Sequence, residues 1–292
     1  MVLLYTKKRK KSTFDLDIRE NYLYNEIRGD YMKNLHLFYF PLLAVLLISC
    51  AAREPAAEVK NDRSGIVLMY HMVSENPRDF SDFCVSPQVL EQDIRYFLSR
   101  GYHFITTSKL KETNQTFLET LKSPGKFVIL TFDDGYQSDL RYVLPLLEKY
   151  QVPATFYITA GLIGQPDYLN YRELKQLSRS EYVEFGNHGN QIHGYPLKNV
   201  KRLYAKYKAY EYVLDDIAKN DAIIYAATGK RTASIAYPYG FYTAALDGLM
   251  RQSFDTITFS TDFGPVLFPL NQNPIKRINR SSTVALEQII ND

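Results

Sequence analysis

Short apolar runs alternate with helix-like patterns along most of the 292-residue chain. The runs that predict buried strands are Ile66–Tyr70, Phe127–Phe132, Ala154–Ile158, Val183–Phe185, Ser234–Tyr237 and Asp255–Phe259. Strands that alternate with helices indicate parallel β/α units, and about seven such units in roughly 230 residues fit a barrel better than two domains. We therefore expect an α/β fold with one folded domain, a distorted (β/α)7-type barrel.

Capping residues indicate where helices begin and end. Ser86 is a good N-cap, Pro87 suits the first helical position, and Gly101 is typical of a helix end. Further helical patterns cover Glu173–Leu177 and, later, roughly Val200–Lys219. The sequence thus predicts one long helix before the strand that begins at Ser234.

The apolar run Leu37–Ile48 is followed directly by Ser49 and Cys50. It is too short for a bilayer-spanning helix, which needs roughly 20 residues, but it has the length of the apolar core of a secretion signal, with Lys33 as the positive flank. The four residues that end at Cys50 resemble a bacterial lipoprotein processing box, in which the cysteine becomes the lipidated N-terminus. A buried core helix or a plain signal anchor is the alternative.

These features divide the chain into four parts. Residues 1–31 precede Met32, where such a signal would begin, and are interpreted as an upstream extension that is not part of the mature protein. Residues 32–49 are the predicted signal peptide, residues 50–64 the lipidated Cys50 and its tether, and residues 65–292 the folded domain. The basic run Lys7–Lys11 could instead be a nucleic-acid or nuclear-targeting patch, but this fits badly beside a secretion signal.

The whole chain has a formal charge of +3 and a pI of about 8.6. The basic surplus comes from residues 1–50, called the leader below. Residues 1–50 contain eight basic and five acidic side chains, so residues 51–292 carry 27 of each sign and are formally neutral. A nucleic-acid-binding domain needs a basic footprint, so that class is disfavoured. Two cysteines cannot form a disulfide framework, and we expect Cys84 to be a small apolar residue.

Two adjacent carboxylates, Asp133 and Asp134, follow the strand Phe127–Phe132, and Gly135 comes next. Side chains at the carboxyl ends of barrel strands form functional sites. Two carboxylates there repel each other unless a cation or a shared proton compensates, and Gly135 permits a sharp turn that lets them converge. An Asp-Gly turn with solvated carboxylates is the simpler interpretation, but the apolar strand before it favours a site.

Two histidines, His188 and His193, follow the strand Val183–Phe185 within a glycine-rich stretch. On a regular helix, residues five apart would point about 140° from each other, but in a loop both rings can face one ion. Two His and one Asp form a common hydrolytic metal set with open positions for water and substrate. Either histidine alone would more often be an ordinary surface or core residue, so the pair is informative mainly together with the two aspartates.

A third feature follows the strand Ser234–Tyr237, in the sequence Tyr237-Pro238-Tyr239-Gly240. Proline stiffens the turn and leaves the Tyr239 backbone N–H free to face a ligand. Alone, this stretch would be read as an ordinary β-turn with Pro and Gly in their usual places.

Together these motifs resemble the polysaccharide deacetylases, the NodB-homology group of carbohydrate esterase family 4, over about residues 65–290. The string Thr131-Phe-Asp-Asp-Gly-Tyr136 is the most specific signature of the family. The five-residue spacing of His188 and His193 resembles the spacing found in the branch of the family that acts on poly-N-acetylglucosamine. The resemblance implies that Asp133 is the general base and that Asp134, His188 and His193 bind a divalent metal. It also implies that the Tyr239 N–H stabilises the oxyanion.

The chain departs from the common family pattern in two ways. No histidine follows His193, so the usual late Leu-x-His motif with its general acid is missing; in the exopolysaccharide branch this motif lies on the first strand, where Leu68-x-Tyr70-His71 matches it. The resemblance therefore implies His71 as the acid, and His103 as structural. The arginine that usually precedes the Pro-Tyr motif is also absent, and Arg277 from the last strand is the candidate to orient the base.

The expected function is therefore metal-dependent removal of N-acetyl groups from an extracytoplasmic polysaccharide, and poly-β-1,6-N-acetylglucosamine is the leading candidate substrate. Peptidoglycan, chitin oligomers and acetylxylan are alternative substrates, and a non-catalytic carbohydrate-binding or export scaffold is an alternative of another class. Zn²⁺ is the expected metal, with Co²⁺, Ni²⁺ or Fe²⁺ also accepted by this ligand set. The expected location is the periplasmic face of an outer membrane or the cell surface, and the lipid is the only expected contact with the membrane. We expect no nucleic-acid partner. Exopolysaccharide export machinery is the expected protein partner.

Overall fold

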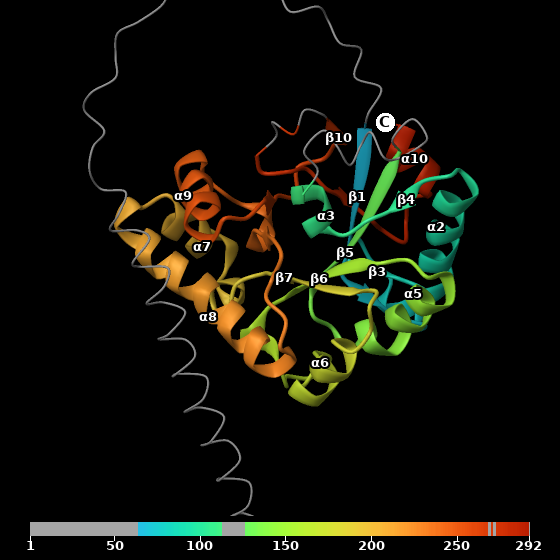
Figure 1. Cartoon of the computed structure of the whole chain (residues 1–292), viewed down its shortest axis with the longest axis horizontal. Helices are drawn as coiled ribbons and strands as arrows, with labels where there is room; N and C mark the ends of the chain where they lie inside the picture. Colours follow the sequence, from blue (N-terminus) through green and yellow to red (C-terminus); the bar gives the residue numbers. More distant parts are fainter. Residues whose placement is uncertain (1–63, 113–125, 268–269, 271–272, 292) are drawn as a thin grey trace, which may run out of the picture.

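A curled sheet, which has nine strands in the described part of the chain, organises the molecule (Figure 1). The computed structural model describes residues 64–112, 126–267, 270 and 273–291. The predicted upstream extension, signal peptide and lipidated Cys50 lie outside these residues, as does the tether except for Ser64. No helix among the described residues has both the length and the apolar character needed to cross a bilayer.

Parallel strands form most of the sheet, in the order β10-β1-β5-β6-β7-β8-β9, with β4 beside the start of β5 and β10 antiparallel to β1. A separate parallel pair joins β2 and β3. The strands are β1 (Ser64–Tyr70), β2 (Met72–Val73), β3 (Cys84–Val85), β4 (His103–Phe104), β5 (Phe127–Asp134), β6 (Ala154–Ile158), β7 (Val183–Asn187), β8 (Ile235–Ala236), β9 (Thr258–Phe259), β10 (Val266–Leu267) and β11 (Ile278–Asn279).

The last parallel strand links the two edges of this run. Ile275 pairs with Phe259 of β9, and a few residues later Ile278 of β11 pairs with Leu68 of β1. Strands β1, β5, β6, β7, β8, β9 and β11 therefore follow one another around a distorted barrel. This confirms the predicted fold class, an α/β barrel of the (β/α)7 type in one domain.

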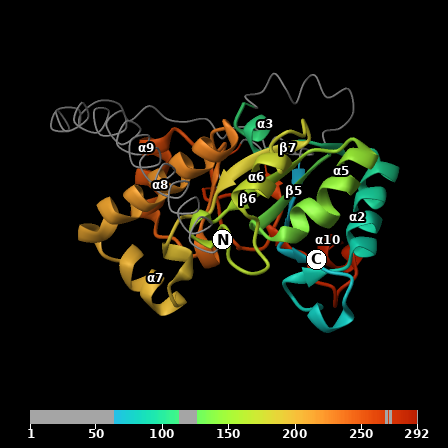
Figure 2. The same ribbon diagram turned by 90° about the horizontal axis from the view of Figure 1, so that it is seen from below.

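Helices cover the outside of the sheet. Helices α2, α5 and α10 lie on one side and α7, α8 and α9 on the other, as both views show (Figures 1 and 2). The helices are α2 (Pro87–Ser99), α3 (Thr107–Glu112), α5 (Leu144–Tyr150), α6 (Tyr171–Leu177), α7 (Leu197–Tyr204), α8 (Tyr210–Thr228), α9 (Ala244–Phe254) and α10 (Leu286–Asn291). Single 3-10 turns cover Pro77–Asp79, Ala160–Leu162, Ile192–Gly194, Tyr207–Ala209 and Pro238–Gly240, and Asp139–Val143 forms a π-helical turn before α5.

Local sequence explains the limits of α2. The Ser86 side chain accepts a hydrogen bond from the Val89 N–H at 3.1 Å, and Pro87 occupies the first turn, as predicted. Gly101, just beyond the helix, has a φ of 71°, the left-handed conformation that glycine adopts without strain.

The prediction of one helix over Val200–Lys219 is wrong. Helix α7 ends at Tyr204, the backbone is extended at Lys206 (φ −104°, ψ 108°), and α8 begins at Tyr210. Tyr204 and Tyr210 are both buried in one apolar cluster, so the break lets α7 and α8 fold against each other. The apolar spacing across the break imitates a continuous helix, which is why the sequence pattern missed it.

Five of the six predicted strands differ in their limits. Strand β1 begins at Ser64, two residues before the prediction, and β7 ends at Asn187, two residues after it. Strand β5 continues past Phe132 and includes both aspartates. Strand β9 begins at Thr258, because Asp255 ends α9 in a left-handed conformation (φ 44°). Strand β8 contains only Ile235 and Ala236 of the predicted Ser234–Tyr237. Helices α3, α9 and α10 and the short strands β2, β3, β4, β10 and β11 were not predicted, since short elements give weak periodic signals.

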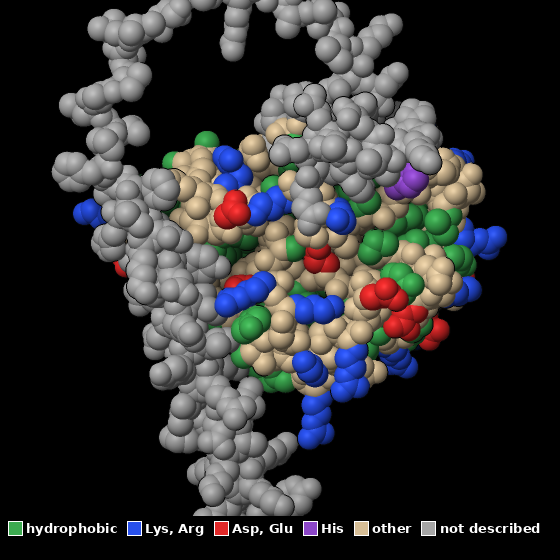
Figure 3. All heavy atoms as spheres, in the orientation of Figure 1, with side chains coloured by type: hydrophobic (Ala, Val, Ile, Leu, Met, Phe, Trp, Pro, Cys, Tyr) green, Lys and Arg blue, Asp and Glu red, His purple; other side chains and the backbone are tan. Residues whose placement is uncertain are grey.

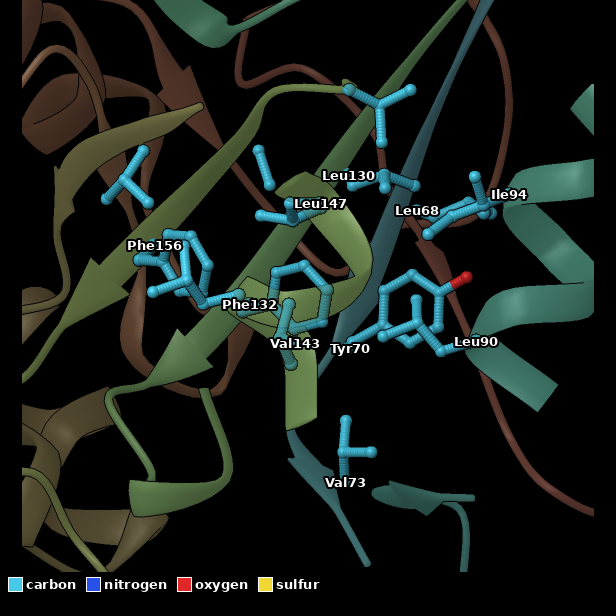
Figure 4. Close-up of a cluster of buried hydrophobic side chains, with 14 of the residues drawn as sticks. Leu68, Tyr70, Val73, Leu90, Ile94, Leu130, Phe132, Val143, Leu147 and Phe156 are labelled. Atoms are coloured by element: carbon cyan, nitrogen blue, oxygen red, sulfur yellow. The ribbon is translucent and has the colours of Figure 1, made fainter. Parts of the chain in front are cut away.

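Alternation along the strands separates two layers of the core. The outward residues Tyr70, Phe132 and Phe156 of β1, β5 and β6 form a row of stacked rings with centroids 5.1 Å apart, packed with residues of α2 and α5 (Figure 4). The inward residues form the barrel interior, where Ile129 and Tyr157 are buried. Because inward residues recur every second position, Asp133 follows Ile129 on the inner side at the carboxyl end of β5.

Charged side chains are scattered on the face shown in Figure 3. Lys and Arg side chains lie at separate places between uncharged atoms, and a few acidic side chains lie among them. This distribution agrees with the formal neutrality of residues 51–292.

Candidate active site

Asp133 and Arg277 form a buried ion pair at the carboxyl end of the barrel. The Arg277 guanidinium donates to both Asp133 oxygens, at 2.7 and 2.8 Å, and its Nε donates to the Ser260 carbonyl at 3.0 Å. Both side chains are almost completely buried. A bidentate guanidinium–carboxylate pair fixes the plane of the carboxylate. The structure thus places Arg277, which the family resemblance suggested as the residue that orients the base, in direct contact with Asp133.

The charge state of Asp133 follows from these contacts. Burial alone would raise the pKa of Asp133, but the charge and hydrogen bonds of Arg277, with smaller contributions from His188 and His71, hold the pKa below its ordinary range. Asp133 is therefore an ionised carboxylate at neutral pH.

Asp134 reaches the same site through an unusual backbone. Successive side chains on a strand point to opposite faces, yet Asp134 has a φ of 76° and Gly135 a φ of 81°. Aspartate is among the few residues other than glycine that adopt the left-handed region with little strain. The turn at the end of β5 thus brings both aspartates to one end of the barrel, although adjacent residues of a regular strand point to opposite faces of the sheet.

The two histidines come from the end of β7 and the loop after it. His188 Nδ1 lies 2.8 Å from the carbonyl of Ala236, and since a carbonyl only accepts, Nδ1 carries the proton and Nε2 has a free lone pair. Burial is the main reason that the pKa of His188 falls to about 4, and the carboxylates of Asp133 and Asp134 oppose this shift without reversing it. His188 is therefore neutral at physiological pH, the form that binds a metal.

Three electron-pair donors converge in this site. Asp134 Oδ1 lies 3.1 Å from His193 Nε2 and 3.6 Å from His188 Nε2, and one donor atom from each residue lies within 4.8 Å of the other two. Asp134 Oδ1 is buried and makes no hydrogen bond. A divalent cation stabilises a buried carboxylate oxygen that lies beside the lone pair of an imidazole nitrogen such as His188 Nε2, so these residues fit a divalent metal.

Tyr239 lies beside His193. Its ring stacks on the His193 ring with centroids 5.0 Å apart, and its hydroxyl donates to the carbonyls of His193 and Tyr195 at 2.8 and 2.9 Å. The backbone of Tyr239 is left-handed (φ 58°, ψ 11°), inside the Pro238–Gly240 turn. These contacts fix the position of the Tyr239 backbone next to the predicted metal ligands.

His71 follows β1 directly and lies near Asp133. Tyr70 pairs with Phe132, so the next residues of the two strands, His71 and Asp133, are neighbours across the strands, and the charge of His71 contributes to the low pKa of Asp133. The Nδ1 atom of His71 is buried without a hydrogen-bond partner, and its ring meets Phe83 edge-on at 5.0 Å. His103, in contrast, is exposed on β4, which pairs with the amino-terminal part of β5, and Cys84 is buried as a free thiol.

The structure also reveals polar residues that the sequence reading missed. Asp216 and Asn220 of α8 lie beneath the loop that carries the histidines, and Asp139 is completely buried after β5 with neither carboxylate oxygen paired. Polar residues four apart on an otherwise apolar helix face were the available signal for Asp216 and Asn220. The predicted helix ended at Lys219, however, so this pair did not stand out.

Comparisons with known proteins find polysaccharide deacetylases. A family model described as "Polysaccharide deacetylase" matches residues 120–253. A poly-beta-1,6-N-acetyl-D-glucosamine N-deacetylase of Staphylococcus aureus is 26% identical over 211 residues, which cover 66% of this chain and 71% of that protein. The enzyme of the same name from Staphylococcus epidermidis is 23% identical over 72% of this chain and 80% of its own length.

Solved structures show the same fold. IcaB from Ammonifex degensii superimposes with a TM-score of 0.60 and 24% identity, over 75% of this chain and 88% of that chain. The deacetylase PplD from Streptococcus pyogenes, solved in complex with acetate, gives a TM-score of 0.64 and 21% identity, over 78% of this chain and 98% of that chain.

Proposed function

Since the chain carries a domain of the polysaccharide deacetylase family, we propose that it hydrolyses N-acetyl groups of an extracytoplasmic polysaccharide, with poly-β-1,6-N-acetylglucosamine as the substrate. The observation that carries this proposal is the convergence of Asp134, His188 and His193 next to the buried Asp133–Arg277 pair. The names of the staphylococcal relatives support the choice of polymer.

Asp134, His188 and His193 would hold the metal, with Zn²⁺ first and Co²⁺, Ni²⁺ or Fe²⁺ as substitutes. When bound, it would supply Lewis-acid polarisation of the acetyl carbonyl and acidify a water molecule. The hydrogen bond from His188 Nδ1 to Ala236 keeps Nε2 directed at the ligand cluster.

The chain's own residues then move the protons. Asp133, ionised and oriented by Arg277, accepts a proton from the water whose oxygen attacks the acetyl carbon. The Tyr239 N–H donates to the oxyanion of the tetrahedral intermediate. When the C–N bond breaks, His71 gives a proton to the leaving amine, and acetate and a free glucosamine amine remain.

A carbohydrate-binding or export scaffold is the alternative of another class. Such a protein gains no binding energy from a buried carboxylate oxygen without a partner, which would instead destabilise it. The unpaired Asp134 Oδ1 therefore favours the enzyme.

The experiment that tests the proposal is acetate release by the full chain from poly-N-acetylglucosamine, peptidoglycan, chitin oligomers and acetylxylan, measured side by side. We expect release from poly-N-acetylglucosamine that stops with a chelator and returns with Zn²⁺. Faster release from another polymer would change the substrate. No release from any polymer after metal is restored would favour the scaffold.

Cys50 is proposed as the lipidated N-terminus of an extracytoplasmic protein that works beside exopolysaccharide export machinery. The support is the sequence of the leader, since a signal core precedes Cys50 and the basic surplus lies before it. Membrane fractionation of cells that express the full chain or Cys50→Ser tests this, with the wild type expected in the membrane fraction and the variant outside it. Equal distribution would contradict lipidation.

A further inference from the structure

The loop between His188 and His193 must hold two ligands that are five residues apart in the chain. A free loop of this length samples many conformations, and ordering it costs conformational entropy at each residue. Gly189 has a φ of 78°, and the Asn187 side chain accepts from the Gly189 N–H at 3.0 Å, which shapes the start of the loop. The middle of the loop needs another support.

Asp216 of α8 provides this support. Its Oδ2 accepts from the Asn190 N–H at 2.8 Å and its Oδ1 from the Gln191 N–H at 2.9 Å, so one carboxylate holds two consecutive amides between the two histidines. Asp216 is 6% exposed, and hydrogen bonds from backbone N–H groups to a buried carboxylate are stronger than those to neutral acceptors. A methyl group on Gly189 would lie 3.2 Å from Asp216 Oδ2, so the loop passes directly over this carboxylate.

Asn220, one turn further along α8, fixes the same helix to the strand ends. Its amide donates to the Ile158 carbonyl and to Asn187 Oδ1, both at 2.9 Å, and its Oδ1 accepts from the Ala160 N–H at 2.7 Å. Since residues four apart share a helix face, Asp216 is held at a set distance from the ends of β6 and β7. The helix thus joins the strand that carries His188 to the loop that leads to His193.

We propose that Asp216 is a positioning residue that sets the separation of His188 and His193, and with it the affinity and geometry of the metal site. It acts through the amides of Asn190 and Gln191 and does not touch the reacting atoms. The proposal rests on the proposed function only in taking the two histidines as metal ligands.

The test is a Co²⁺ titration of the metal-free full chain, followed by visible absorption and by competition with a chromophoric chelator. Asp216→Asn keeps the size of the side chain but offers one acceptor oxygen to two amides. We expect its Kd for Co²⁺ to rise about 10- to 100-fold, with an altered absorption band, as is typical when a partner of metal ligands is lost. Asp216→Glu, which keeps the carboxylate, should recover part of this affinity.

Asp221 provides the matched control on the same helix. It is 4% exposed, pairs with Arg231 at 2.8 Å and accepts from Thr232, and it makes no contact with the histidine loop. Asp221→Asn should lower the free energy of unfolding and leave the Co²⁺ Kd and absorption band unchanged. Equal Co²⁺ binding by wild type and Asp216→Asn, or equal weakening by Asp221→Asn, would overturn the proposal.

If Asp216→Asn does not fold, Gly189→Ala disturbs the same contact from the loop side. Its methyl group would crowd Asp216 Oδ2 and would also strain the left-handed backbone at Gly189, so it should weaken Co²⁺ binding, whereas unchanged binding would contradict the positioning role. Co²⁺ binding does not depend on the polymer. A wild-type chain that binds Co²⁺ tightly but releases no acetate would therefore count against the proposed function and leave the role of Asp216 standing.

Discussion

The two ends of the barrel both contain buried polar clusters, and they differ in how well their atoms are paired. At the amino end, Glu184 accepts hydrogen bonds from the Thr107 N–H at 3.0 Å and from the Thr155 hydroxyl at 2.8 Å. The Ser234 hydroxyl is hydrogen-bonded to the hydroxyls of Thr107 and Tyr157, each at 2.7 Å. No buried side-chain atom of this cluster lacks a partner in the described structure.

At the carboxyl end, the pairing is incomplete. Asp133 and Arg277 satisfy each other, but Asp134 Oδ1 and His71 Nδ1 are buried without hydrogen bonds. Unpaired buried polar atoms cost free energy, so they persist where a ligand or a reaction uses them. Neither polar burial nor an unpaired atom alone identifies the site, since Asp139 is also buried and unpaired. The site is where an unpaired carboxylate oxygen lies among imidazole nitrogens at metal-ligand spacing.

The largest expected effect is at Asp133. Asp133→Asn removes the base, and we expect acetate release to fall by about 10²- to 10⁴-fold while metal binding persists, since Asp134, His188 and His193 remain. Acetate release and bound metal are measured on the same samples. Turnover within about tenfold of the wild type would contradict the role of Asp133.

Asp93→Asn is the matched control, because it breaks the other buried Arg–Asp pair. Arg280 contacts Asp93 at 2.6 and 3.1 Å, away from the metal ligands. Loss of one partner of a buried ion pair costs about 3–5 kcal/mol, so both variants should lose stability, but only Asp133→Asn should lose turnover out of proportion to its folded fraction.

The next largest effect is expected at Glu184, where a substitution should change stability without changing the site at the other end of the barrel. Glu184→Gln leaves some of the donors at the amino end without an acceptor, so the free energy of unfolding should fall by about 1–3 kcal/mol, measured by urea denaturation. The metal Kd and the rate of acetate release should match the wild type, since the hydrogen bonds of Glu184 go to Thr107, Ser108 and Thr155 and not to the site residues. A change in metal affinity would show that the two clusters are coupled.

The smallest effect is at Asp139, which is unpaired but lies outside the proposed chemistry. Burial, with the charges of Asp134 and Asp133, holds the pKa of Asp139 well above its ordinary value. The folded state therefore binds more protons than the unfolded state above pH 3.8, so this group lowers stability as pH rises toward the folded-state pKa. Asp139→Asn should remove this decline and raise the free energy of unfolding at pH 8 by of the order of 1 kcal/mol.

Urea denaturation of the metal-free wild type and of Asp139→Asn at pH 5 and pH 8 checks this prediction. The difference between the two proteins should be larger at pH 8. An equal difference at both pH values would show that Asp139 does not titrate between them.

The sequence predicted the parts of this molecule that depend on local pattern. The fold class followed from alternating strands and helices, and Asp133, Asp134, His188 and His193 stood out because they follow apolar strands. The contact between Arg277 and Asp133 joins residues 144 positions apart, and only the resemblance to a family suggested it.

The remaining features depend on packing that local patterns do not encode. The break between Tyr204 and Tyr210 preserves helix-like spacing, so the pattern could not show it. The roles of Asp216 and Asn220 depend on their contacts with the strand ends and the histidine loop, which α8 crosses. Asp139 is distinctive only because both of its oxygens are buried and unpaired. These properties arise from tertiary contacts.

The most direct test of the metal centre at the carboxyl end is an equilibrium Zn²⁺ titration of the metal-free full chain and of its Asp134→Asn variant, with acetate release measured at each point. We expect one ion per wild-type chain, with acetate release rising in proportion to occupancy. The variant should bind at least about 10-fold more weakly and release little acetate. Equal Zn²⁺ affinity in the two proteins, or acetate release that does not follow occupancy, would contradict this assignment.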